Sequence, residues 1–262
     1  MLIDMHVHTR RHSACGRAEP QEMVAAARRF GLDALVFTEH HVVWGEEELA
    51  ELQHEFPSIR LFTGVEISTE ASGDLLVIGA EGTDWFAPRM PAEIAVEEAH
   101  ARGGIVIAAH PYRAGYGTKG LDKLPLDAAE IYSLHMHLGA HQQAVRLASA
   151  RDLHTVATSD AHAPDAVGLY AIRLDEPAVS ERALAEIVLA GMYTLFADEN
   201  RVEALNRDRE PAWREAQRLI GEGLDDGDVV ARVDGVGYTE ARLLRQGQPM
   251  SWPLPASMEV FE

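Results

Sequence analysis

Short runs of apolar and β-branched residues alternate with helical patterns, and this alternation restricts the fold more than any other feature of the chain. Helices are predicted at Pro20–Phe30, Pro91–Arg102, Gln142–Ala150 and Ser180–Ala190. Near-continuous apolar strands that alternate with helices are typical of a mostly parallel sheet covered by helices. The sequence therefore predicts an α/β fold with strands at Leu2–Val7, Leu32–Thr38, Leu61–Val65, Leu75–Ile78, Ile105–Ala109, Glu130–Leu134, Thr155–Thr158, Ala171–Leu174 and Thr194–Phe196.

The pattern changes after Ala197. Arg201–Ile220 predicts a charged helix, and the rest of the chain mixes turns with one short helical pattern at Thr239–Leu244. We predict an α/β domain over residues 1–196 and a C-terminal extension over residues 197–262 that packs on it. The chain of 262 residues is long enough for one α/β barrel, which takes about 250.

Composition excludes several classes of protein. Apolar residues make up 47% and charged residues 25%, so the chain can bury a core. Its formal net charge of −19 repels phosphate backbones, which disfavours binding to extended nucleic acid. No run approaches the ~18 apolar residues of a membrane helix, and Met1–His8 contains no signal-peptide pattern. Because the single cysteine, Cys15, also fits a reducing compartment, we predict a cytoplasmic protein without a membrane anchor.

Five of the predicted strands stop at residues that bind metal ions. In a β/α barrel the C-terminal ends of the strands converge on one face. Residues i and i+2 of a strand point the same way, so two histidines in an H-x-H pair can hold one ion. One histidine at a strand end is usually a hydrogen-bonded core residue. Five strand ends that all carry such residues are difficult to explain by chance. Imidazole and carboxylate ligands suit Zn, Mn or Fe. The five segments are His6-Val7-His8, Glu39-His40-His41, Val65-Glu66, Ala109-His110 and Asp160-Ala161-His162.

These segments, in this order, resemble the polymerase and histidinol phosphatase (PHP) family. The resemblance extends over roughly residues 1–196. It implies a distorted seven-stranded β/α barrel that carries two or three divalent ions at the C-terminal ends of its strands. The motifs that carry it are Asp4-Met5-His6-Val7-His8-Thr9, Gly31-Leu32-Asp33-Ala34-Leu35, Thr38-Glu39-His40, Gly64-Val65-Glu66, Ala109-His110-Pro111, Ser159-Asp160-Ala161-His162 and Val167-Gly168.

The resemblance also implies which residues hold the ions. Glu66 would bridge a first and a second ion, and His110 would hold the second. His40 and His162 would hold a third. The remaining ligands of the first ion would be His6, His8 and Asp160. Family members are mostly phosphoesterases, and this chain has no room for a polymerase domain.

Two departures from the family pattern leave ligands unassigned. The family often has a histidine in a segment reading H-L-L-G, where this chain reads Leu76-Val77-Ile78-Gly79. His135 or His137 is a candidate replacement at the second ion. The third ion usually takes a ligand from the loop after H-x-H, and both His12 and Cys15 lie in that loop.

The predicted chemistry is hydrolysis of a phosphate ester. Two cations that share Glu66 would lower the pKa of a bound water and deliver hydroxide. Arg113 is predicted to clamp the phosphate because its planar guanidinium matches phosphate oxygens, and Lys119 is a weaker second clamp. Asp160 or His162 would orient the nucleophile or the leaving group.

The substrate that we predict is a small phosphorylated molecule, so the protein would be a phosphomonoesterase or phosphodiesterase. Two alternatives remain open at this stage. One is a nuclease that acts on short oligonucleotides at the same site, and the other is a non-catalytic metal-binding protein. The sequence leaves the oligomeric state open.

Overall fold

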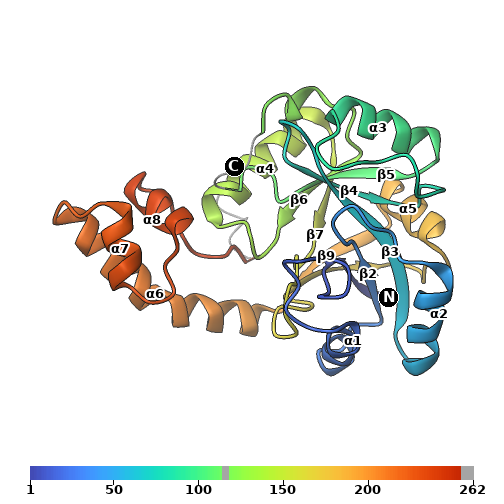
Figure 1. Ribbon diagram of the computed structural model, residues 1–262, viewed down its shortest axis with the longest axis horizontal. Coiled ribbons are helices and arrows are strands. Elements are labelled where there is room, and N and C mark those ends of the chain that lie inside the picture. Colours follow the sequence, from blue (N-terminus) through green and yellow to red (C-terminus); the bar gives the residue numbers. More distant parts are fainter. Residues whose placement is uncertain (114–117, 255–262) are drawn as a thin grey trace.

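The computed structural model describes residues 1–113 and 118–254. In these residues nine strands form one sheet, in the order β7-β6-β5-β4-β3-β2-β1-β8-β9 (Figure 1). The strands are β1 (Leu2–Val7), β2 (Ala34–Phe37), β3 (Arg60–Ser68), β4 (Asp74–Ile78), β5 (Ile105–Ala109), β6 (Ala128–Tyr132), β7 (His154–Ala157), β8 (Tyr170–Leu174) and β9 (Tyr193–Ala197). The helices are α1 (Pro20–Arg29), α2 (Glu46–Glu55), α3 (Ala92–Ala101), α4 (Leu138–Arg151), α5 (Glu181–Leu189), α6 (Glu199–Gly221), α7 (Asp226–Arg232) and α8 (Tyr238–Arg245), with a 3-10 turn at Leu121–Lys123.

The sheet is an almost closed barrel. Val7 at the end of β1 pairs with Ala161 just after β7, and β7 also contacts β8 and β9. The expected α/β barrel is thus confirmed, but the sheet has nine strands where the family resemblance implied seven. Strands β8 and β9 account for the difference, since they pair antiparallel beyond β1.

The prediction of a mostly parallel sheet is wrong for part of the barrel. Pairs β1–β2, β2–β3, β5–β6 and β6–β7 are parallel, whereas β3–β4, β4–β5, β1–β8 and β8–β9 are antiparallel. Only residues 69–73 connect β3 to β4. A connection that short joins antiparallel strands, because a parallel crossover needs a dozen residues or more. As a result β4 runs in the opposite direction to both of its neighbours.

Alternate residues of the strands fill the barrel interior. This core includes Met5, Val36, Leu76 and Ile107, and α5 packs against it through residues such as Leu184. The opposite faces of the strands pack against the other helices, for example α1 and α2 over β1 and β2. With one end of the interior filled by apolar side chains, the polar strand ends are left to form the other rim.

The helices α6, α7 and α8 form an arm that projects from the barrel (Figure 1). After α8 the chain returns to the barrel beside α4. Leu138 N donates to Ser251 O at 2.8 Å, Trp252 Nε1 donates to Leu134 O at 2.7 Å, and Tyr170 Oη donates to Pro253 O at 2.8 Å. The predicted extension thus makes contact with the barrel through this return segment, and its residues 255–262 lie outside the described part of the chain.

No helix within residues 1–113 and 118–254 combines the length and the apolar character that a membrane span requires.

Candidate metal centre

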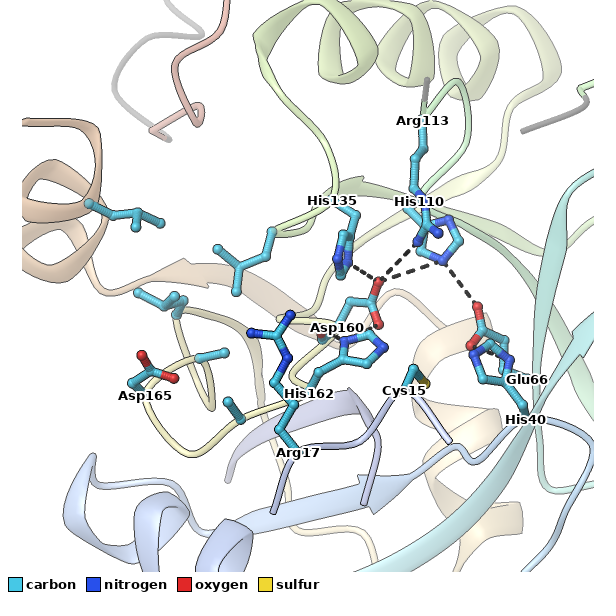
Figure 2. Close-up of a pocket in the computed structure, with 15 residues that line it drawn as sticks. Cys15, Arg17, His40, Glu66, His110, Arg113, His135, Asp160, His162 and Asp165 are labelled. Atoms are coloured by element: carbon cyan, nitrogen blue, oxygen red, sulfur yellow. Dashed lines mark hydrogen bonds and ion pairs between the residues drawn. The ribbon is translucent and has the colours of Figure 1, made fainter. Parts of the chain in front are cut away.

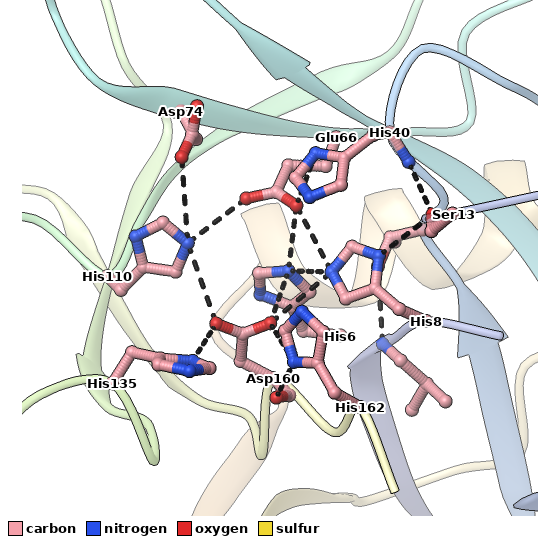
Figure 3. Close-up of polar contacts among 12 residues, drawn as sticks. His6, His8, Ser13, His40, Glu66, Asp74, His110, His135, Asp160 and His162 are labelled. Carbon is pink, nitrogen blue, oxygen red and sulfur yellow. Dashed lines mark hydrogen bonds and ion pairs between the residues drawn. The ribbon is translucent and has the colours of Figure 1, made fainter. Parts of the chain in front are cut away.

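The polar rim of the barrel brings together all seven residues predicted to bind ions (Figure 3). These seven are His6 and His8 at the end of β1, His40 after β2, Glu66 in β3, His110 after β5, and Asp160 and His162 after β7. His40 and His162 are partly exposed, and the other five are buried. Since these residues come from distant parts of the sequence, only the closure of the barrel places them together.

A register shift in β1 directs both of its histidines to the rim. Pairing between β1 and β2 is irregular between Asp4 and Val7. Met5 therefore points into the apolar core, yet His6 and His8 point into the polar cluster while Val7 packs outside. Irregularities of this kind re-aim side chains and are common beside active sites.

Glu66 lies at the centre of the cluster. Its Oε2 lies 3.4 Å from His6 Nε2, 3.1 Å from His8 Nε2 and 3.1 Å from His40 Nδ1. Its Oε1 lies 3.0 Å from His110 Nε2. One carboxylate thus reaches imidazoles from three other strand ends, as a bridging metal ligand would.

Asp160 occupies the opposite side of the cluster. Its Oδ1 lies 3.2 Å from His6 Nε2 and 3.3 Å from His8 Nε2, and its Oδ2 contacts His135 Nδ1. His162 Nδ1 lies 3.7 Å from Oδ1. The two carboxylates therefore hold His6 and His8 between them.

The geometry of the cluster fits cations better than hydrogen bonds. Glu66 Oε2 and Asp160 Oδ1 are buried and have no hydrogen-bond partner in the described residues, although imidazole nitrogens surround them. Buried polar atoms are almost always paired, so unpaired carboxylate oxygens that lie next to imidazole nitrogens are the arrangement expected of ligands to a cation. Ligand atoms lie within 4.8 Å of one another in four triads: His6-Glu66-His110, His6-His8-Asp160, His8-Cys15-His40 and His135-Asp160-His162.

The pKa values of the two carboxyl groups and of the His8 imidazole in the cluster are shifted in opposite directions. Burial opposes ionisation of Glu66 and Asp160, but His6 and the other imidazoles hold the pKa of both carboxyls well below its usual range. Burial lowers the pKa of His8, yet Asp160 and Glu66 outweigh it and raise the value to about 9. Burial lowers the pKa of His162 to about 4. Both carboxylates are therefore ionised at neutral pH, and His162 is a neutral imidazole that can donate a lone pair to a metal ion.

The structure separates the residues that the sequence left as alternatives. Cys15 lies with His8 and His40, while His12 hydrogen-bonds Glu48 at 2.8 Å and packs against a tryptophan. His135 joins Asp160 and His162 at the rim. His137, in contrast, packs against Trp213 and Trp252. Cys15 and His135 are thus the candidates that lie near the cluster.

Two buried acids to which the sequence reasoning gave no role support the cluster. Glu130 in β6 accepts hydrogen bonds from His6 Nδ1 at 2.8 Å, from the backbone N–H of His110 and from Thr158 Oγ1. Glu39 accepts from the Thr9 backbone N–H and from Ser13 Oγ. Carboxylates that fix the second nitrogen of a ligating histidine orient the ring and raise its basicity. An acid inside an otherwise apolar strand, as Glu130 is in β6, was the available signal.

Asp74 was missed as well, and it corrects the comparison with H-L-L-G. Leu76 and Ile78 of the stretch chosen from the sequence lie in the barrel core. Because β4 is antiparallel, its first residue, Asp74, lies at the rim opposite Ala109. The Asp74 carboxylate is buried, and its Oδ2 lies 3.9 Å from His110 Nε2. Asp74 is therefore placed to supply a carboxylate where the family often has a histidine.

We expect Asp74→Ala to lower the metal content by about one ion per chain, because Glu66 and His110 alone would bind a second ion weakly. Elemental analysis of the purified variant after dialysis measures this loss. Asp33→Ala is the matched control, since Asp33 lies just before β2, away from the rim, and its Oδ2 accepts from Leu2 N. A wild-type metal content in Asp74→Ala would show that Asp74 is no ligand.

A cleft of about 530 Å³ opens above the cluster (Figure 2). Glu66, His110, Asp160 and His162 form its polar floor. Arg113 lies at one side, with an Nη 3.8 Å from Asp160 Oδ2, and Arg17 lines the cleft as a second cation that the sequence did not suggest. Lys119, the weaker candidate clamp, is not among the residues that line this cleft.

Comparison with known proteins agrees with this geometry. The PHP domain family matches residues 4–152, and a PHP-associated family matches residues 139–193. An uncharacterized protein of Methanocaldococcus jannaschii is 27% identical over 148 residues, which cover 52% of this chain and 83% of that protein.

Two solved structures share the fold. A two-domain protein from Bacteroides vulgatus, described as containing a predicted PHP-like metal-dependent phosphoesterase, aligns with a TM-score of 0.59 and 21% identity. The alignment covers 75% of this chain and 64% of that one, so the chain spans less than two thirds of its length. A lesion-specific endonuclease from Pyrococcus furiosus aligns with a TM-score of 0.53 and 16% identity, over 74% of this chain and 58% of that one.

The barrel fold and the histidines and carboxylates at its rim together define a PHP-type domain with the side chains to hold metal ions. The chain belongs to the PHP family, whose domain matches more than half of its length.

Proposed function

We propose that this protein hydrolyses phosphate esters of small molecules with two or three divalent ions held at the rim. The contact of Glu66 with imidazoles from three other strand ends is the observation that carries the proposal. His6, His8 and Asp160 would complete a first site, His110 and Asp74 a second, and His40 and His162 a third. When bound, such ions supply a hydroxide at neutral pH and neutralise charge on the phosphate.

The other residues of the cleft bind and orient the substrate. Arg113 is placed to pair with non-bridging phosphate oxygens, because it borders the cleft beside Asp160. Four imidazoles surround Asp160, those of His6, His8, His110 and His135. We therefore assign Asp160 first as an ion ligand, and it would orient the nucleophile or the leaving group only through that role. His162 is neutral at physiological pH and is partly exposed to the cleft, which suits a ligand that also contacts the leaving group.

A small substrate fits the size and charge of the site. The cleft volume of about 530 Å³ lies within the range of small-molecule pockets. The net charge of −19 disfavours a long polyanion. We also propose a cytoplasmic location, because a chain with a single cysteine fits a reducing compartment.

A nuclease is the second candidate. The fold similarity to the Pyrococcus furiosus endonuclease favours it, because that protein is described as a lesion-specific endonuclease. The chemistry at the ions would be the same in both cases, and only the substrate would differ.

Release of inorganic phosphate from sugar phosphates, nucleotides and aryl phosphates, with Mn or Zn added, tests the proposal. We expect turnover of at least one phosphomonoester and none in Asp160→Asn. A ladder of products from a labelled oligonucleotide, without release from small esters, would favour the nuclease. Full metal loading without hydrolysis of either substrate class would indicate a non-catalytic metal-binding protein.

We expect Arg113→Ala to lower kcat/KM for a phosphomonoester by about 10²-fold, because loss of one preorganised charged donor costs about this much. Arg113→Lys should recover part of the rate, since lysine keeps the charge but not the planar pair of donors. The matched control is Arg146→Ala, an exposed arginine of α4 that does not line the cleft. An unchanged rate in Arg113→Ala with an unchanged metal content would remove Arg113 from the site.

A further inference from the structure

A second cavity of about 480 Å³ lies beside the metal cleft. The two cavities share Arg113 and His135 in their walls, so they meet at the rim of the barrel. One wall of the second cavity comes from the barrel and α4, and the other comes from α8 and the segment that follows it. Gln143 of α4 lies on the first wall, and Arg242 and Gln246 lie on the second.

The charge of this cavity is opposite to that of the chain. Among the described residues, no aspartate or glutamate lines it, although acidic residues outnumber basic ones 42 to 23 in the whole chain. Two arginines, Arg113 and Arg242, line it together with three glutamines. A cavity that excludes carboxylates and presents guanidinium and amide groups is suited to an anion.

Two other arginines that lie near Arg242 in the arm are paired with acids. Arg245 pairs with Asp226 at 2.8 Å, and Arg209 pairs with Glu240 at 2.7 Å. Within residues 1–113 and 118–254, Arg242 forms no ion pair and donates no side-chain hydrogen bond. Its charge is therefore available to a ligand in the cavity.

Building on the proposed function, we propose that this cavity binds a second anionic group on the leaving-group side of the substrate, with Arg242 as a specificity-determining residue. The substrate class is then a phosphate ester whose alcohol portion carries a further phosphate. Arg113 lies between the two cavities, so the phosphate that reacts and the second anion would flank it. In the hydrolysis a water oxygen bonds to phosphorus, the ester P–O bond breaks, and the leaving oxygen takes a proton from the water.

Two matched substrate pairs test this assignment in the metal-loaded full chain. The first pair is a hexose bisphosphate and the corresponding hexose monophosphate, and the second is a 5′-phosphorylated dinucleotide and the corresponding mononucleotide. We expect the wild type to have a higher kcat/KM for the doubly phosphorylated member of one pair than for its partner. Which pair shows this preference tells whether the substrate is a sugar phosphate or a nucleotide. Arg242→Gln should remove this preference by raising KM about tenfold for that member alone, as loss of a charged hydrogen bond predicts.

The control is Arg232→Gln, which removes the same charge from the exposed end of α7, outside both cavities. It should leave both members of each pair unchanged. The assignment would be overturned if Arg242→Gln and the wild type had equal kinetics, or if the wild type preferred neither doubly phosphorylated compound. In both cases, hydrolysis of the monophosphates would leave the proposed function intact.

If the wild type hydrolyses no ester, the proposed function fails and binding decides the assignment separately. Calorimetric titration with the hexose bisphosphate and with the dinucleotide should then show binding of at least one compound that weakens in Arg242→Gln and persists in Arg232→Gln. Equal binding to all three proteins, or no binding to the wild type, would contradict a role for Arg242.

Discussion

Glu66→Gln should abolish phosphoester hydrolysis, with kcat/KM lower by at least about 10³-fold. The expectation follows from the position of one carboxylate between His6, His8, His40 and His110, at distances of 3.0–3.4 Å. Glutamine keeps the shape of the side chain but removes the charge that two ions would share. We therefore expect the metal content to fall by one ion or more, as measured by elemental analysis beside the rate.

Glu81→Gln is the matched control for this variant. Glu81 is an exposed acid whose contact is an ion pair with Arg182 at 3.4 Å, and the substitution removes the same charge far from the rim. Its activity and its metal content should equal those of the wild type. A Glu66→Gln protein that keeps wild-type turnover would show that the reaction does not depend on a bridged pair of ions. Circular dichroism of both variants establishes that the barrel is intact.

Removal of metal should destabilise the protein, and the loss should be larger at alkaline pH. An ion present at about a thousand times its dissociation constant stabilises the folded state by about 4 kcal/mol, which corresponds to a rise in Tm of on the order of 10 °C for a chain of this size. Thermal unfolding with Mn or Zn, compared with unfolding in a chelator, measures this difference.

The pH dependence follows from the histidines of the metal-free site. The folded pKa of His8, about 9, lies above its ordinary value of 6.5. The stability that its protonated form contributes is therefore complete below pH 6.5 and is lost as the pH rises through 9. Glu66 and Asp160 have lowered folded pKa values, so their contribution is present at neutral pH and is lost only in acid. The metal-free protein should thus lose stability between neutral and alkaline pH.

A bound ion replaces the proton of His8, so metal binding should release protons and tighten as the pH rises. The Tm difference between loaded and metal-free protein should accordingly grow from pH 6.5 to pH 9. Calorimetric titrations in buffers of different ionisation enthalpy count the protons released. A Tm difference that shrinks over this range, or binding without proton release, would contradict the assignment of His8 as a ligand.

Much of the fold was predictable because its signals are local. All nine strands are present close to their predicted positions, since each is a short apolar run between turns. The helices α2 and α7 were not predicted; α2 opens with three consecutive glutamates, and α7 has only seven residues. The direction of β4 was also missed in the sheet prediction, although the predicted strands Leu61–Val65 and Leu75–Ile78 leave only nine residues between them, which is too few for a parallel crossover.

Local patterns in the sequence were enough to identify the main candidates for the site. The pairs His6/His8 and Asp160/His162, each two residues apart at a strand end, are local patterns, and so are Glu66 and His110. The resemblance to the PHP family, which the family match confirms, added a testable grouping of these residues around shared ions.

Which further residues reach that rim depends on how the whole chain folds. Asp74 lies there because β4 runs antiparallel, and Cys15 rather than His12 lies beside His8 because of the path of its loop. Glu130 supports His6 from a strand 124 positions away, and Arg242 borders the second cavity because the arm returns its helix toward α4. Local sequence sets which face of a strand a residue occupies, whereas the order and direction of strands depend on packing across the whole barrel.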